Sequence, residues 1–97
     1  MTVQFSSDIR LPSLIRQQLS GHAERLLERH HHNFGSMFLE IYLRPEGPQV
    51  ACIASLVTDD GRYHAQVSGW DIRQVMLDAL GRIDTQAHKR VEKRAYA

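Results

Sequence analysis

The sequence lacks most of the features that mark specialised classes of protein. It has one cysteine, Cys52, so no intramolecular disulfide can form, and its setting in "QVACIASLV" predicts a buried thiol in a reducing cytoplasm. No run approaches the ~20 apolar residues of a membrane span. The start, "MTVQFSSDIR", has no cationic segment followed by an apolar one, so we expect no signal peptide.

Signatures of catalysis and metal binding are also missing. The sequence contains no G-x-S-x-G, no H-E-x-x-H and no glycine-rich phosphate loop, and the pair Asp59 and Asp60 suits a turn. The run of His30, His31 and His32 cannot form one tetrahedral metal site on a helix, because consecutive helical residues diverge by about 100°. We therefore expect no enzyme activity, no metal and no cofactor. The histidine run is interpreted as a partly cationic helix end.

What the sequence does contain is typical of one folded domain spanning residues 1–97. Hydrophobic residues make up 42% of the chain and charged residues 24%, which is the composition of a globular protein rather than a disordered one. No internal repeat, linker or low-complexity tract interrupts it.

The spacing of apolar residues predicts six elements in the order β-α-β-β-β-α. Alternation in "TVQFSS" predicts a strand from about Thr2 to Ser7, and apolar residues at three- and four-residue intervals predict a helix over about 12–31, with Pro12 in its first turn. Three further strands are predicted at "SMFLEIYLR", "QVACIASLV" and "RYHAQVSG", joined by "PEGP" and by the tight Asp-Gly hairpin of "TDDG". Asp71 is expected to cap a last helix that ends near Arg94.

Each predicted helix is apolar on one side only. Both helices should therefore pack on the same face of a four-stranded sheet, which makes the fold class α+β. The opposite face of the sheet is then expected to be polar and exposed. In the last helix the apolar side consists of Ile72, Val75, Met76, Ala79, Leu80, Ile83 and Ala87.

Positive charge is concentrated in the last helix, although the net charge of the chain is only +1. Residues 1–70 hold six Lys and Arg against seven Asp and Glu, whereas residues 71–97 hold six against four. Two helices side by side would bring basic stripes onto a common outer surface, which suits nucleic acid. The alternative is a solvated surface whose bases complement the helix dipole. The candidate RNA-binding residues are His22, Arg25, Arg29, Arg82, Gln86, Lys89, Arg90 and Lys93. Within each helix all of them except Arg90 follow one another at intervals of three or four residues, which places them on one side of the helix.

The order of elements, together with "HAQVSGWDIRQVMLDALGRIDTQAHKRVEKR", resembles the ribosome hibernation-promoting factor family. That family is also called ribosome-associated inhibitor A or sigma-54 modulation protein, and the resemblance is to its short form, without the extra dimerisation domain of long members. It covers essentially the whole chain. The features shared with the family begin with a His-Ala pair at the start of the last strand, here His64 and Ala65, and a Gly-x-Asp sequence before the last helix, here Gly69 and Asp71. Within that helix they are a basic residue, a Gln and two spaced Lys residues, here Arg82, Gln86, Lys89 and Lys93.

The resemblance implies a non-enzymatic factor that binds the small ribosomal subunit in the channel for mRNA and tRNA. Basic residues of both helices are expected to contact ribosomal RNA and so to inhibit translation in stationary phase or stress, in a bacterial cytoplasm, with no membrane or small-molecule substrate. An alternative is a family-like module whose helix surface binds a protein instead of a ribosome. A double-stranded RNA-binding domain is disfavoured, because the first strand is extra and the last helix does not begin with a lysine-rich cluster.

Overall fold

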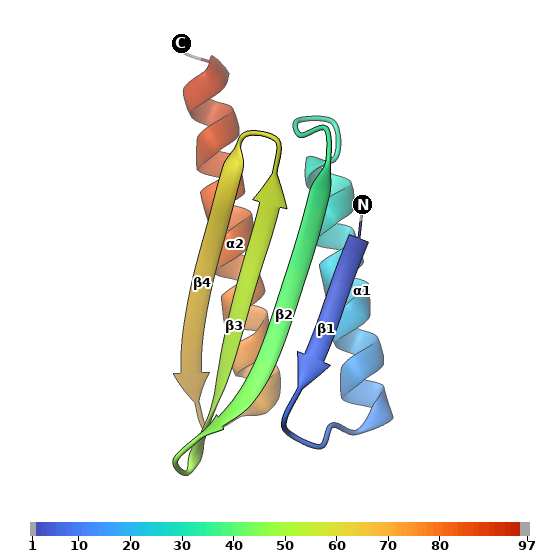
Figure 1. Cartoon of the computed structure of the whole chain (residues 1–97), viewed down its shortest axis with the longest axis vertical. Helices are drawn as coiled ribbons and strands as arrows, with labels where there is room; N and C mark the ends of the chain where they lie inside the picture. The colour runs from blue at the N-terminus through green and yellow to red at the C-terminus, as the bar shows by residue number, and fades with distance from the viewer. Residues whose placement is uncertain (1, 96–97) are drawn as a thin grey trace.

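All six expected elements are present, in the expected order, in the computed structural model of the chain (Figure 1). The structure describes residues 2–95, and side chains within residues 2–93, so the Arg94 side chain lies outside the described part. The α+β class and the β-α-β-β-β-α order are confirmed. The elements are β1 (Thr2–Ser7), α1 (Ser13–His30), β2 (Met37–Glu46), β3 (Gln49–Thr58), β4 (Gly61–Gly69) and α2 (Ile72–Ala95).

The four strands form one sheet in the order β1-β2-β3-β4. β1 runs parallel to β2 because α1 carries the chain back between them, whereas two hairpins make β2, β3 and β4 antiparallel. Both helices lie on one face of this sheet, as predicted (Figure 1). Within the described part of the chain, neither helix combines the length and apolarity needed to cross a membrane.

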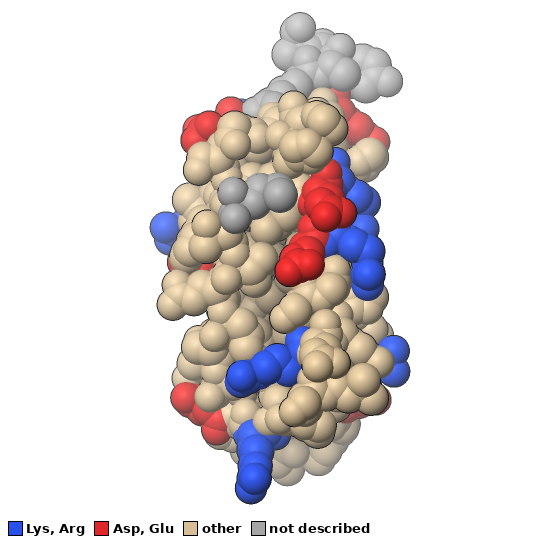
Figure 2. Space-filling model, turned by 90° about the vertical axis from the view of Figure 1, so that its right-hand side faces the viewer, with Lys and Arg blue, Asp and Glu red and all other residues tan. Residues whose placement is uncertain are grey.

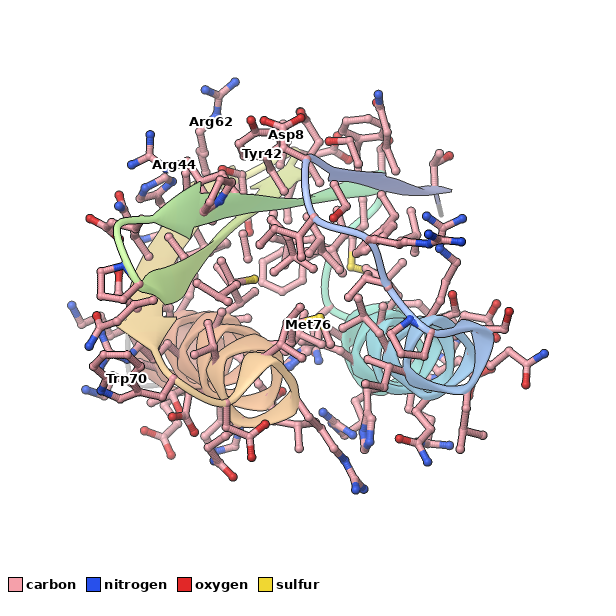
Figure 3. The ribbon with its side chains drawn as sticks, turned by 90° about the horizontal axis from the view of Figure 1, so that it is seen from below. Asp8, Tyr42, Arg44, Arg62, Trp70 and Met76 are labelled. Carbon is pink, nitrogen blue, oxygen red and sulfur yellow. The ribbon has the colours of Figure 1, made fainter. Side chains whose placement is uncertain are left out.

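The core lies between the sheet and the two helices. β2 turns Met37, Leu39, Ile41 and Leu43 inward, and all four are buried, as their alternation predicted. Met76 lies in the layer between the helices and the sheet (Figure 3). Each large buried aliphatic side chain contributes about 1.5–3 kcal/mol to folding. The predicted apolar side of α2 is buried except for the partly exposed Ile72, and α1 buries Leu19, Ala23, Leu26 and Leu27.

The ends of two elements differ slightly from the predicted ones. Pro12 precedes α1 as its N-cap, with a ψ of 144°, rather than lying in the first turn. β2 continues through Pro45, so "PEGP" is not all turn, and only the residues after Glu46 reverse the chain. Pro45 is tolerated there because β1 pairs with β2 only as far as Leu43. Gly47 supplies the positive φ of 59° that the turn requires.

The predicted tight hairpin between β3 and β4 and the Asp71 cap are confirmed, but the two turn residues are Asp59 and Asp60 rather than the Asp-Gly pair, since Gly61 already begins β4. Gly61 closes the β3–β4 hairpin with a φ of 148°. The Asp71 carboxylate accepts hydrogen bonds from the backbone N–H groups of Arg73, at 3.0 Å, and Gln74, at 3.4 Å, at the start of α2.

The face of the sheet without helices is less polar than predicted. On the edge strands β1 and β4 its residues are polar and exposed, as expected. On the central strands β2 and β3, however, it carries four half-buried side chains that are wholly or largely apolar: Phe38, Tyr42, Ile53 and Val57. The prediction of a polar face failed because β3 carries apolar residues at successive positions. Side chains alternate between the two faces of a strand, so such a run places apolar residues on both faces of the sheet.

Candidate nucleic-acid interface

The outer surface of the helix pair is hollowed around the line where α1 and α2 meet. Its shallow depressions adjoin one another, and Arg29, Asp84 and Thr85 each line two of them. The two helices therefore bring most of the candidate RNA-binding residues onto connected parts of one surface. The candidate residues that line these depressions are His22, Arg25, Arg29, Arg82, Gln86 and Lys89.

Most of the candidate cations form no ion pair with the described acidic side chains. Within the part of the chain whose side chains are described, no ion pair involves Arg25, Arg82, Lys89, Arg90 or Lys93. Arg25 Nη2 lies 3.4 Å from Nδ1 of His22, a neighbour on the same helix. Arg90 and Lys93 are exposed in the last turns of α2. An unpaired, solvated cation can exchange its water for a phosphate oxygen without first breaking a protein contact.

Arg29 differs from the other candidate cations because it is already paired. Its guanidinium lies 3.2 Å from one Asp84 oxygen, across the junction of the two helices. The other Asp84 oxygen lies 2.6 Å from His30 Nε2. Asp84 therefore joins two neighbouring residues of α1 to α2 and offsets part of the positive charge at the centre of the surface.

The histidine run divides into one buried and two exposed residues. His30 is only 5% exposed and points inward, toward Asp84 and Phe34, so it lies where the helices pack rather than on their outer surface. The interpretation of the run as a partly cationic helix end stays a prediction. His31 Nδ1 lies 2.8 Å from the Glu28 carbonyl oxygen and its ring lies against that of His32. Among the described residues, no three His, Cys, Asp or Glu side chains gather as a metal-binding group.

Gln86 contacts the protein backbone rather than only solvent. Its carboxamide accepts a hydrogen bond from the His64 N–H, at 3.3 Å, and donates one to the His64 carbonyl oxygen, at 2.9 Å. His64 lies on β4, the strand at one edge of the sheet. Gln86 thus satisfies backbone groups that would otherwise be open at this edge. It lies in the predicted stripe, but both ends of its carboxamide are occupied.

Acidic residues interrupt the positive surface. Asp78, Asp84 and Glu92 line the same depressions as the cations of α2. On the neighbouring side of the molecule, which β1 and α1 border, blue and red side chains are interspersed and no continuous basic area forms (Figure 2). The positive surface of the helix pair therefore does not continue onto this side as one basic area.

Two ionisable groups outside this surface have shifted pKa values. Burial raises the pKa of the Cys52 thiol to about 11, which confirms the predicted buried thiol. The hydrogen bond from Tyr42 to Asp8, together with partial desolvation, raises the pKa of the Tyr42 phenol. Both effects oppose ionisation, so neither group is activated as a nucleophile or base.

Sequence reasoning missed the contacts that cross between elements. Nothing in the spacing of α2 indicated that Gln86 would reach β4 or that Asp84 would hold His30. The one available signal was Asp84 itself, an acid four positions after the apolar Leu80. Pairing of that acid with α1 depends on how the helices pack, which spacing within one helix does not reveal.

Comparisons with known proteins identify the fold. No protein-family model and no curated protein matches the sequence. Among solved structures, the N-terminal domain of Protein Y from Thermus thermophilus matches with a TM-score of 0.71 and 15% identity, over 91% of this chain and 93% of that one. A ribosomal subunit interface protein from Coxiella burnetii matches with a TM-score of 0.69 and 14% identity, over 95% of this chain and 99% of that one. The chain therefore has the fold that its resemblance to the ribosome hibernation-promoting factor family implied.

Proposed function

We propose that this protein binds the small ribosomal subunit through the outer surface of its helix pair and so inhibits translation. It occupies the channel for mRNA and tRNA, and contacts ribosomal RNA there. It acts in the bacterial cytoplasm in stationary phase or stress, as a single ribosome-binding domain of the hibernation-factor type. The proposal needs no cofactor, metal, membrane or small-molecule substrate.

The observation that carries this proposal is the set of unpaired cations on a surface built by two helices. Complementation of the helix dipole accounts for cations in the last turn of α2, such as Arg90 and Lys93. It does not account for Arg82, which lies near the middle of that helix, or for Arg25 on the other helix. A phosphate backbone that crosses both helices accounts for all of them. The fold shared with a ribosomal subunit interface protein supports the same partner.

The interface residues suit binding rather than chemistry. They are guanidinium and ammonium groups, one imidazole and an amide whose hydrogen bonds are already made within the protein. Cations of this kind give affinity for RNA backbone with little dependence on sequence. Asp78, Asp84 and Glu92 lower the local potential, so the contribution from electrostatics is smaller than on a uniformly basic surface.

Occupancy of the channel can be tested by competition on purified small subunits. Subunits are incubated with the protein at low salt, with or without prebound mRNA and tRNA, and are separated on a sucrose gradient. The protein should sediment with empty subunits and should be largely absent from subunits whose channel is filled. Purified large subunits provide the matched control for non-specific binding to RNA.

Two outcomes would contradict the proposal at different levels. If the protein stays at the top of the gradient with empty small subunits, ribosome binding is wrong. If it sediments equally with filled and empty subunits, it binds the ribosome outside the channel, and the proposed mode of inhibition is wrong. Equal binding to large and small subunits would show affinity for RNA without selectivity.

A further inference from the structure

The face of the sheet that lies opposite the helices has the anatomy of a protein interface. Its centre, on β2 and β3, is formed by the half-buried Phe38, Tyr42, Ile53 and Val57. An apolar centre inside a polar rim is typical of surfaces that bind another protein. The rim on the edge strands is polar and exposed: Thr2, Gln4, Ser6, Arg62, His64, Gln66 and Ser68.

This face also has a ridge next to a trough. On the outward side of β2 every residue is large: Phe38, Glu40, Tyr42 and Arg44. Their cross-strand partners on β3 are smaller in each case: Val57, Ser55, Ile53 and Ala51. Ala51 is fully buried although it faces outward, so larger neighbours already lean over the trough at that point.

We propose that a second copy of this chain packs on this face, related by a two-fold axis parallel to the strands and between β2 and β3. This axis places β2 of one copy over β3 of the other without shifting either along the strand direction. Each ridge residue on β2 therefore meets, in the second copy, the same β3 residue with which it is paired in its own sheet. Phe38 faces Val57 of the second copy, Tyr42 faces Ile53, and Arg44 faces Ala51. The result is a sandwich of two four-stranded sheets about 10 Å apart.

The charges on this face fit a copy of the same chain better than they fit RNA. Its cations, Arg44 and Arg62, project from the sheet on the same side as Asp8 (Figure 3). The alternation along β2 places the acids Glu40 and Glu46 on this face as well. The face is therefore close to neutral, which removes the long-range attraction that a phosphate backbone needs. A balanced face also avoids repulsion when it meets itself.

The polar groups of this face are held in place for such a contact. Tyr42 donates its hydroxyl hydrogen bond to Asp8, which fixes the ring on the ridge. Ser68 donates to Glu46 and draws that carboxylate over the trough. Arg44 Nε is buried and has no partner among the described residues. The two-fold arrangement brings the Arg44 guanidinium toward Glu46 of the second copy, where the two opposite charges pair.

The size of the face indicates a weak dimer rather than a permanent one. Four strands about 4.8 Å apart, over about eight residues at ~3.3 Å each, project roughly 500 Å² on each copy. The total of roughly 1,000 Å² lies at the lower limit for a specific interface. We therefore expect dissociation in the micromolar range. Both helix surfaces point away from the dimer and stay free, so this inference does not depend on RNA binding.

Sedimentation equilibrium of the purified protein, without RNA, tests this inference. The average mass should rise from 11.1 kDa toward twice that value as concentration increases. Ile53→Lys places a charge in the trough and should raise the dissociation constant at least about tenfold. Gln66→Lys is the matched control, since it adds the same charge in the same cross-strand row but at the exposed rim, and it should leave the mass curve nearly unchanged.

A charge exchange keeps the test decisive if Ile53→Lys unfolds the protein, which circular dichroism would reveal. Arg44→Glu alone should weaken the dimer, and Arg44→Glu combined with Glu46→Arg should restore it. A wild-type protein that stays at 11.1 kDa at all concentrations would overturn the proposal. So would a folded Ile53→Lys protein that still dimerises, or an Arg44→Glu protein that dimerises as well as the wild type. Binding of single-stranded RNA that Ile53→Lys abolishes in a monomeric wild type would assign the face to RNA instead.

Discussion

The Gln86 carboxamide is paired with the backbone of His64 through two hydrogen bonds, one accepted at 3.3 Å and one donated at 2.9 Å. A side chain of α2 therefore takes the place of a neighbouring strand beside β4, the edge strand that follows β3. The contact fixes the position of α2 relative to the sheet. Arg82 and Lys89 lie one turn before and one turn after Gln86, so this contact also helps to set where their side chains lie relative to the sheet.

Substitution of Gln86 by Leu should lower the free energy of unfolding and should leave affinity for the small subunit nearly unchanged. The change leaves the N–H and carbonyl of His64 without their protein partner, and each such bond contributes about 0.5–1.5 kcal/mol. We expect the free energy of unfolding to fall by about 1–2 kcal/mol in urea titrations. Gln17→Leu, on an exposed position of α1, is the control. Equal stability of the two variants would show that the edge contact is unimportant.

Substitution of Asp84 by Asn should change stability and affinity in opposite directions. Loss of the carboxylate removes the charged partner of the buried His30 and should lower the free energy of unfolding by about 1–2 kcal/mol. It also frees Arg29 and removes one negative charge from the surface, so affinity for the small subunit should rise severalfold.

The control for Asp84→Asn is Glu40→Gln, which removes the same charge from the opposite face of the sheet. This variant should leave affinity nearly unchanged, because its site is remote from the helix surface. An Asp84→Asn protein that binds more weakly than the wild type while remaining folded would contradict our assignment of the surface.

Cys52 should resist alkylation in the native protein. Burial raises the pKa of its thiol from 9.0 to about 11, so near neutral pH the thiolate fraction is about a hundredfold lower than in the unfolded chain. Mass spectrometry after timed exposure to iodoacetamide should show slow labelling in buffer and fast labelling in denaturant. Equal rates under the two conditions would mean that the strand region around this residue opens readily.

Tyr42 should make folding sensitive to alkaline pH. Its pKa is raised above 10.0 in the folded protein, chiefly by the hydrogen bond to Asp8, so the neutral phenol is favoured in the folded state. The resulting stability is fully present below about pH 10 and is lost as the pH rises through the folded-state pKa. Tyr42→Phe should show a smaller decline in melting temperature over this range. Parallel declines in the two proteins would show that the Asp8 contact does not persist in solution.

Features that depend on neighbouring residues in the chain were predictable from the sequence. The alternation of β2 gave the correct buried residues, and Asp71 was correctly identified as the cap of α2. Both follow from local geometry, because side chains alternate along a strand and a cap contacts the two or three residues that follow it. The buried state of Cys52 was predictable for a similar reason, since its segment is small and apolar.

Features that depend on packing between distant elements were not predictable. The sequence indicated that His30 lies at a helix end but not what it contacts, whereas the approach of α2 places Asp84 beside it and buries its ring. Gln86 was expected to contact RNA with the rest of its stripe, but it lies close enough to β4 to form hydrogen bonds with the backbone. In both cases the partner is more than twenty residues away, and only the packed helices bring it within hydrogen-bonding distance.

The central claim is that unpaired cations of α2 bind ribosomal RNA, and the salt dependence of binding to purified small subunits tests it most directly. Lys89→Gln with Lys93→Gln should hardly change stability, since exposed charges contribute little. Affinity should fall, and the slope of log affinity against log salt should flatten by about one unit for each lost phosphate contact. Arg10→Gln with Arg62→Gln removes the same charge elsewhere and should leave the slope unchanged. If the lysine variant and this control have the same affinity and the same salt slope, the cations of α2 do not contact RNA, and the proposed function is contradicted.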